Sequence, residues 1–158
     1  PYYITTPIVM KILEETNNIK SIVIMIQKEV AQRLVAKPNT KDYGAITLAI
    51  DYYADATIKF TVPAGAFVPA PKVESAVVCL DILDKKRVDV SNEKQFFKII
   101  KAAFGQRRKT LVNAISNNFP NISKDDVKNV LNSLGISETI RGEALSIYDY
   151  EKISNSFK

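Results

Sequence analysis

The chain has 158 residues, of which 46% are hydrophobic and 25% are charged, and its formal net charge is +5. This length is enough to bury a core as one domain or as one and a half domains. No apolar run approaches the roughly 18 residues that span a membrane, and no charged leader with a cleavage site is present, so we expect a soluble, cytoplasmic protein with no membrane partner. Histidine is absent, which excludes serine–histidine and cysteine–histidine nucleophiles and leaves few plausible zinc sites, and we expect no metal.

The first half of the chain alternates between helix and strand patterns. Thr6 followed by Pro7 is typical of an N-cap and a first helical residue. The further predicted elements are a strand at 21–26, helices at 27–36 and 43–55, and strands at 56–63 and 74–83. A loop stiffened by prolines separates the last two strands, and Cys79 in the last one is interpreted as a small buried hydrophobic residue. This order predicts an α/β fold.

The pattern becomes helical after residue 91. Ser91 is the predicted cap of a helix, and apolar side chains then recur at helical spacing: Phe97, Ile100, Phe104, Leu111 and Ile115. Ser123 is the predicted cap of the next helix and Gly135 its end, and residues 146–157 predict a last helix. We therefore predict a domain boundary between residues 84 and 91, with domains at 1–84 and 85–158.

The net charge is concentrated next to that boundary. Residues 1–83 are neutral, with eight basic and eight acidic side chains, whereas residues 85–113 hold nine basic and two acidic side chains, a net charge of +7. Such an excess indicates either a surface for a phosphate backbone or a solvated helix face, and we leave both interpretations open at this point.

Tyr2 and Tyr3 precede the first predicted helix and lie on a strand-to-helix loop. In an open α/β sheet, loops at the carboxyl ends of strands line the ligand crevice, where an aromatic ring can lie against a flat substrate. The alternative is an aromatic plug over the core.

Six segments of the sequence resemble one known family, in its order and with compatible spacing. They are PYYITTP, QKEVAQRL, YGAITLAIDYY, AFVPAPKVESAVV, AFGQRRKTL and RGEALSIYDY, and they resemble blocks of the ribosomal RNA adenine dimethyltransferases. The resemblance implies the C-terminal half of a Rossmann-like methyltransferase sheet followed by a small all-helical domain. It also implies S-adenosylmethionine as cofactor and, as partners, small-subunit ribosomal RNA and the pre-ribosomal particle.

The family's cofactor-binding half would precede Pro1. The five glycines of the chain are too far apart to form a cofactor-cradling loop. We therefore expect these residues alone to lack a cofactor site and to be inactive.

The resemblance assigns the catalytic pocket to Pro1, Tyr2 and Phe67. Pro1 and Tyr2 match the end of the family's Asn-Leu-Pro-Tyr loop, and Phe67 matches a second aromatic residue, so that two rings would sandwich a flipped adenine. The alternative for Phe67 is a lid over the core. Tyr3 is interpreted as a packing residue.

The resemblance also assigns an RNA-binding block, Arg107, Arg108 and Lys109. Counted from Lys94 along a continuous helix, Lys98, Lys101 and Arg108 fall at offsets 4, 7 and 14, on the face opposite Phe97, Ile100 and Phe104. Side chains that extend this surface are expected to be Lys28, Arg33 and Lys72.

Two other functions remain open from sequence: a large-subunit RNA methyltransferase of the antibiotic-resistance type, and a non-catalytic RNA-binding or ribosome-assembly module. We also expect an uncovered sheet edge, through which the chain could self-associate.

Overall fold

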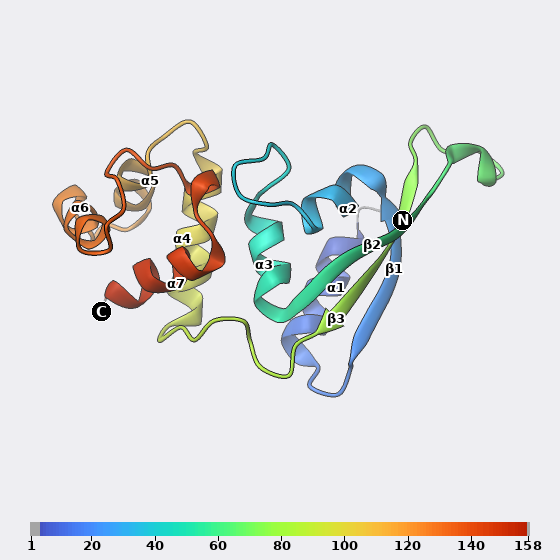
Figure 1. The fold of residues 1–158 in the computed structure, drawn as a ribbon, viewed down its shortest axis with the longest axis horizontal. Helices are drawn as coiled ribbons and strands as arrows, with labels where there is room; N and C mark the ends of the chain where they lie inside the picture. The colour runs from blue at the N-terminus through green and yellow to red at the C-terminus, as the bar shows by residue number, and fades with distance from the viewer. Residues whose placement is uncertain (1–3, 158) are drawn as a thin grey trace.

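A computed structural model describes residues 4–157. The first half contains helices α1 (Thr5–Glu15), α2 (Lys28–Leu34) and α3 (Ala45–Tyr53), strands β1 (Ser21–Gln27), β2 (Ala54–Val62) and β3 (Ser75–Ile82), and the short 3-10 helix η2 (Ala64–Ala66). The second half contains α4 (Glu93–Gly105), α5 (Leu111–Asn118), α6 (Lys124–Ser133), η3 (Gly142–Ala144) and α7 (Ile147–Ser156). The predicted α/β half followed by a helical half is confirmed (Figure 1).

The described sheet has three antiparallel strands in the order β1-β3-β2. Ala76, Val78 and Leu80 of the central strand are completely buried, because side chains alternate between the two faces and these three face the core. On the opposite face Val23 and Phe60 remain 65% and 58% exposed. Cys79 is buried, as expected of a small hydrophobic residue.

One end of this sheet carries the segment in which an aromatic site residue was predicted. Gln27, the last residue of β1, and Val62, the last residue of β2, both pair with Ser75 at the start of β3. The connection from β2 to β3, residues 63–74, therefore leaves the sheet at the end where β1 also finishes, and it projects away from the body of the molecule (Figure 1).

Two predicted helix starts were wrong. α1 begins at Thr5 after Ile4, so Thr6 is not its cap, and Pro7 is accepted because the first N–H groups of a helix have no intrahelical partner.

At α4 the cap is Asn92, whose Oδ1 accepts the Gln95 N–H at 3.0 Å. Ser91 instead donates its N–H to Asn155 Oδ1 of α7 at 2.9 Å. The predicted cap Ser123 and the helix end at Gly135, where φ is 69°, are confirmed.

Aromatic side chains join the two halves. The Tyr52 ring of α3 lies with its centroid 5.5 Å from that of Phe96 and 5.1 Å from that of Phe97, both on α4. Buried residues of both halves form one continuous cluster, so α3 and α4 pack as neighbours (Figure 1). The division into domains 1–84 and 85–158 stays a prediction. Among residues 4–157, no helix has the combined length and apolarity to cross a membrane.

Candidate functional site

The loop 63–74 places Phe67 directly after η2. Its side chain is partly buried, and its N–H donates to the Ala64 carbonyl at 3.3 Å. The far end of the loop is fixed twice to the start of α2: the Lys28 N–H donates to the Glu74 carbonyl at 3.0 Å, and the two side chains form an ion pair at 2.9 Å. Phe67 is therefore held on a connection that is anchored at both ends.

The residues predicted to partner Phe67 lie outside the described part of the chain. They are Pro1 and Tyr2, and Tyr3, the predicted packing residue, lies there too. The structure describes Ile4, which shares a shallow cavity of about 280 Å³ with Ile24 and Met25 in the second half of β1. The two-ring adenine pocket stays a prediction.

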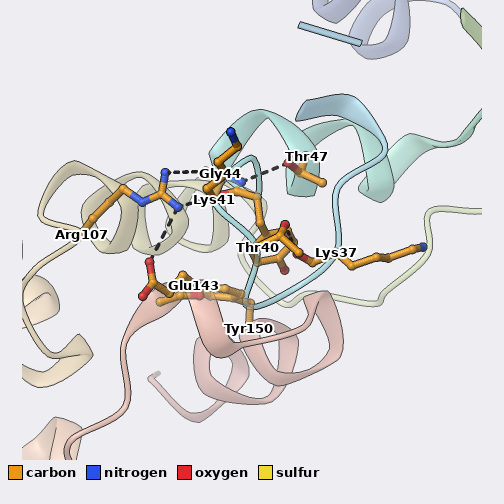
Figure 2. A network of polar contacts seen from close by, with 10 residues as sticks. Lys37, Thr40, Lys41, Gly44, Thr47, Arg107, Glu143 and Tyr150 are labelled. Atoms are coloured by element: carbon orange, nitrogen blue, oxygen red, sulfur yellow. Dashed lines mark hydrogen bonds and ion pairs between the residues drawn. The ribbon is translucent and has the colours of Figure 1, made fainter. Parts of the chain in front are cut away.

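A second site lies where the two halves meet, and we call it the junction cleft. It is a cavity of about 430 Å³ lined by Arg33, Lys41, the start of α3 and Arg107, with Glu29 and Asp42 also on its wall. Gly44, Ala45 and Ile46 at the start of α3 line it, and the first N–H groups of a helix have no intrahelical partners. Gly44 donates its own N–H to Thr47 Oγ1 at 3.0 Å (Figure 2). The fold thus brings together two predicted RNA-binding residues, Arg33 and Arg107, that lie far apart in sequence.

Arg107 has structural partners of its own. Its guanidinium donates to the Lys41 carbonyl at 3.3 Å and to the Tyr43 carbonyl at 3.0 Å, and it lies 3.7 Å from the Glu143 carboxylate (Figure 2). These contacts tie the turn after α4 to the segment before α3 and to η3. Sequence reasoning missed Lys41, Tyr43 and Glu143, because nothing local relates them to Arg107.

The predicted basic face of α4 is only partly present. Lys94, Lys98 and Lys101 are exposed, opposite the buried Phe96 and Ile99. Arg108 was wrongly placed on this face: the helix ends at Gly105, and residues 106–108 form a turn. The predicted packing side is confirmed, since Ile100 is buried and Phe97 and Phe104 pack against the core, but the completely buried Phe96 was missed.

The remaining predicted basic residues differ in exposure and in whether they form ion pairs. Arg108 and Lys109 are exposed in the turn, and Lys72 is exposed on the loop 63–74. Arg33 is exposed and pairs with Glu29 at 3.0 Å, while Lys28 is engaged by Glu74. Basic side chains therefore occupy three places: the loop 63–74, the junction cleft and the exposed face of α4 with the turn after it.

Tyrosine hydroxyls near the junction act as hydrogen-bond donors. Burial raises the pKa of Tyr43 far above its usual value, and its hydroxyl donates to the Leu145 carbonyl at 2.6 Å. Burial raises the pKa of Tyr53 to about 12. The hydrogen bond from Lys86 is the main cause that lowers the pKa of Glu93; burial acts in the opposite direction, and the hydrogen bond from Tyr52 lowers the pKa further. None of these groups is poised to exchange a proton near neutral pH, which suits a role in packing.

Solved structures show the class of protein to which this fold belongs. A crystal structure of a dimethyladenosine transferase from Plasmodium falciparum matches with a TM-score of 0.79 at 25% identity, over 97% of this chain and 62% of that chain. The 23S rRNA methyltransferase ErmE matches with a TM-score of 0.67 over 99% of this chain and 62% of its own; at 18% identity this likeness shows the fold alone. The fold is that of the Rossmann-like RNA methyltransferases.

Sequence comparison gives the family. The model of the ribosomal RNA adenine dimethylase family matches residues 1–157, and the chain belongs to this family, as the six segments indicated. The ribosomal RNA small subunit methyltransferase A of Alkaliphilus oremlandii is 51% identical over 99% of this chain and 54% of its own length. The protein of the same name from Clostridioides difficile is 50% identical over 98% of this chain and 53% of its own length. The chain spans about half the length of these curated relatives.

Proposed function

We propose that the complete protein transfers methyl groups from S-adenosylmethionine to the exocyclic amine of adenines in small-subunit ribosomal RNA. The observation that carries this proposal is the match of residues 1–157 to the adenine dimethylase family, supported by 51% and 50% identity to relatives named as small-subunit methyltransferases. Because the chain spans about half of those relatives, we assign the activity to the complete protein.

The proposed reaction requires an adenine outside its base stack. Its amine is a poor nucleophile, since the lone pair is delocalised into the ring, and hydrogen-bond acceptors stabilise the charge that develops during transfer. Extruding the base costs a few kcal/mol, which aromatic faces offset. Phe67 supplies one such face on its anchored loop, and we assign Pro1 and Tyr2 to the same pocket from the family resemblance.

The described residues do not fit the cofactor. Bound S-adenosylmethionine would supply the methyl group, but within residues 4–157 no glycine-rich loop joins a strand to a helix. We propose that its site lies in a part of the complete protein beyond these residues, and that the 158-residue chain alone is inactive. Isothermal titration of this chain is expected to give no micromolar S-adenosylmethionine binding.

The test of function uses the complete protein and small-subunit particles that lack the modification. We expect methyl incorporation at adenines, and a loss of about fivefold to 150-fold in kcat/KM for Phe67→Ala, the equivalent of stacking one base. Phe67→Tyr retains the ring, and Phe60→Ala removes an aromatic side chain that is 58% exposed on the sheet; both are expected to leave the rate near wild type. A wild-type protein that leaves adenines unmodified would contradict the proposal.

The RNA partner is proposed to be held by basic residues on the loop 63–74, at the junction cleft, on α4 and in the turn that follows α4. We assign this role to Arg33, Lys72, Lys94, Lys98, Lys101, Arg107, Arg108 and Lys109, whose exposure supports contact with phosphates. We further propose that the protein acts on the pre-ribosomal particle in the cytoplasm, where such RNA would be its substrate.

The two other functions are less well supported. ErmE shares the fold at 18% identity, whereas the small-subunit relatives are about half identical, so the small-subunit substrate is favoured. For a non-catalytic assembly module, the discriminating observation is the coding sequence upstream of Pro1: a glycine-rich loop and an Asn-Leu pair before the proline favour an enzyme.

We also propose that this chain self-associates through β1, an edge strand of the described sheet with exposed Val23 and Met25.

A further inference from the structure

A cavity of about 620 Å³ lies in the helical half, distinct from both the loop 63–74 and the junction cleft. Its walls come from α4, from the segment 119–122 that follows α5, from α6 and from the end of α7. Its volume falls within the roughly 300–1,000 Å³ that is usual for small-ligand sites. We call it the α4–α6 groove.

The apolar part of the groove is aromatic and branched. Phe119, which is 9% exposed, and Phe157, which is partly buried, line it together with Ile122 and Val130. The Lys98 ammonium lies 4.4 Å from the centroid of the Phe119 ring and, among the described residues, has no carboxylate partner. A cation–π contact therefore holds an uncompensated positive charge at the groove.

The polar part of the groove includes two free side-chain amides. Asn121 and Asn129 are exposed and line the groove from the segment after α5 and from α6, and their side-chain amides make no hydrogen bond within residues 4–157. An amide offers both donors and an acceptor, the combination that reads the edge of a nucleobase. The one acidic side chain on the wall, Asp126, is already occupied, since it accepts from the Ser123 N–H at 2.8 Å and from its hydroxyl at 2.6 Å.

We infer that the α4–α6 groove binds an unpaired nucleobase of RNA, with Lys98 contacting its phosphate and Asn121 and Asn129 contacting its edge. Lys98 lines the groove, and the exposed Lys94 and Lys101 on the same face of α4 supply further charge complementary to the connecting backbone. Apolar walls, two free amides and a lysine are together typical of sites that bind single-stranded RNA. This inference rests on the proposed function, because it adds a second RNA contact remote from the methylated base.

The first test measures binding of the complete protein to a single-stranded oligoribonucleotide, to the same strand with abasic positions, and to its duplex. We expect the wild type to prefer the single strand with bases. The double variant Asn121→Ala with Asn129→Ala is expected to lose affinity for that strand by about fivefold to thirtyfold, while its binding to the abasic strand stays unchanged. The matched control is Asn17→Ala with Asn18→Ala, two exposed asparagines of the first half, which is expected to bind as the wild type does.

A second comparison distinguishes binding in the groove from general electrostatic attraction to the basic face of α4. Lys98→Gln and Lys94→Gln each remove one positive charge from the same face of α4, and because only Lys98 lines the groove, the first should weaken binding of the single strand with bases more than the second does. All four substituted asparagines are exposed, so melting temperatures are expected to stay within a few degrees of wild type, which excludes misfolding as the cause.

The outcomes that overturn the inference are distinct from failure of the proposed function. Equal binding of strands with and without bases by the wild type, or equal affinity of the double variant and its control, rejects the groove even if methylation proceeds. If the groove binds a protein segment instead of RNA, the double variant and its control would bind the RNA with equal affinity. If the wild type fails to methylate adenines but binds strands with bases more tightly than abasic strands, and this preference depends on Asn121 and Asn129, the proposed function is wrong and the inference about the groove is supported.

Discussion

Arg107 and Arg108 are adjacent in sequence, yet the structure gives them different surroundings. Arg107 donates to two carbonyls of the segment before α3 and faces Glu143, whereas Arg108 is exposed in the turn and makes no hydrogen bond or ion pair with the described side chains. The family resemblance assigns both to RNA. At the residue scale, stability and RNA binding can therefore be separated by comparing these neighbours.

We expect Arg107→Ala to lower the free energy of unfolding by about 1 kcal/mol, because charged hydrogen bonds are lost at a partly solvent-screened position. Arg108→Ala is the matched control and should unfold at the wild-type urea concentration. Arg108→Glu should weaken binding of the complete protein to ribosomal particles and flatten its dependence on salt, since phosphate contacts release counterions. Equal urea midpoints for both alanine variants would contradict a structural role for Arg107.

Glu93 gives a pH dependence. The bonds from Lys86 at 2.6 Å and from Tyr52 at 2.8 Å favour its ionised form, so its pKa lies below the usual 4.5 in the folded chain. A lowered folded pKa means that the stabilisation is present above the unfolded pKa and is lost as pH falls through the folded one. Urea unfolding followed from pH 7 to pH 3 should show this loss, and Glu93→Gln should reduce the slope in the acidic range. An unchanged slope would contradict the assignment.

At the scale of elements, β1 combines an open edge with an uncharged sequence. SIVIMIQ carries no ionisable side chain, and Val23 and Met25 are 65% and 43% exposed. Strands of this kind pair with other chains unless charge or cover prevents it. The other edge strand, β2, carries Asp55 and Lys59, both exposed.

We therefore expect the 158-residue chain to associate with increasing concentration, and Met25→Lys to suppress this. Thr57→Lys places the same charge on an exposed position of β2 and serves as the control. Sedimentation equilibrium over a range of concentrations measures the effect. A wild-type chain that stays monomeric at every concentration would refute the edge-pairing hypothesis.

The sequence predicted elements better than it predicted where they end. The strand at 21–26 and the helix after Ser123 were visible because apolar periodicity and capping residues are local signals. Arg108 was misplaced because periodicity counted along a continuous helix cannot report that the helix ends at Gly105.

The junction cleft could be predicted even less. Arg33, Lys41 and Arg107 meet only through packing of α3 on α4, and no spacing in the chain relates them. The groove residues Asn121 and Asn129 carried no motif at all. By contrast, the prediction of Phe67 as a site residue came from family resemblance, which carries tertiary information that composition and periodicity lack.

At the scale of the whole molecule, aromatic contacts between α3 and α4 join the two halves in one core. Phe96 is completely buried and touches the rings of Tyr52 and Phe97. Removing it leaves a cavity in a core that both halves share.

Phe96→Ala is expected to cost about 3–5 kcal/mol, a large part of a typical domain's stability. Both halves should then unfold at the same lower denaturant concentration, because neither keeps its packing surface. The measurement is urea unfolding followed by circular dichroism and by hydrogen exchange of β3 and α6. Tyr148→Ala, at a side chain that is 51% exposed, should change stability by less than about 1 kcal/mol. Separate transitions for the two halves would contradict a shared core.

The same α3–α4 packing fixes the reach of the molecule. The loop 63–74 projects at one end, and α5 and α6 lie at the other (Figure 1). Because packed aromatic rings of α3 and α4 join the two halves, the distance between the loop 63–74 and the helical half is expected to be fixed. Under the proposed function, an RNA bound by the helical half would present to Phe67 only those nucleotides that lie one set distance along its folded path, so selection among adenines would follow from the spacing of the RNA structure as well as from its local sequence.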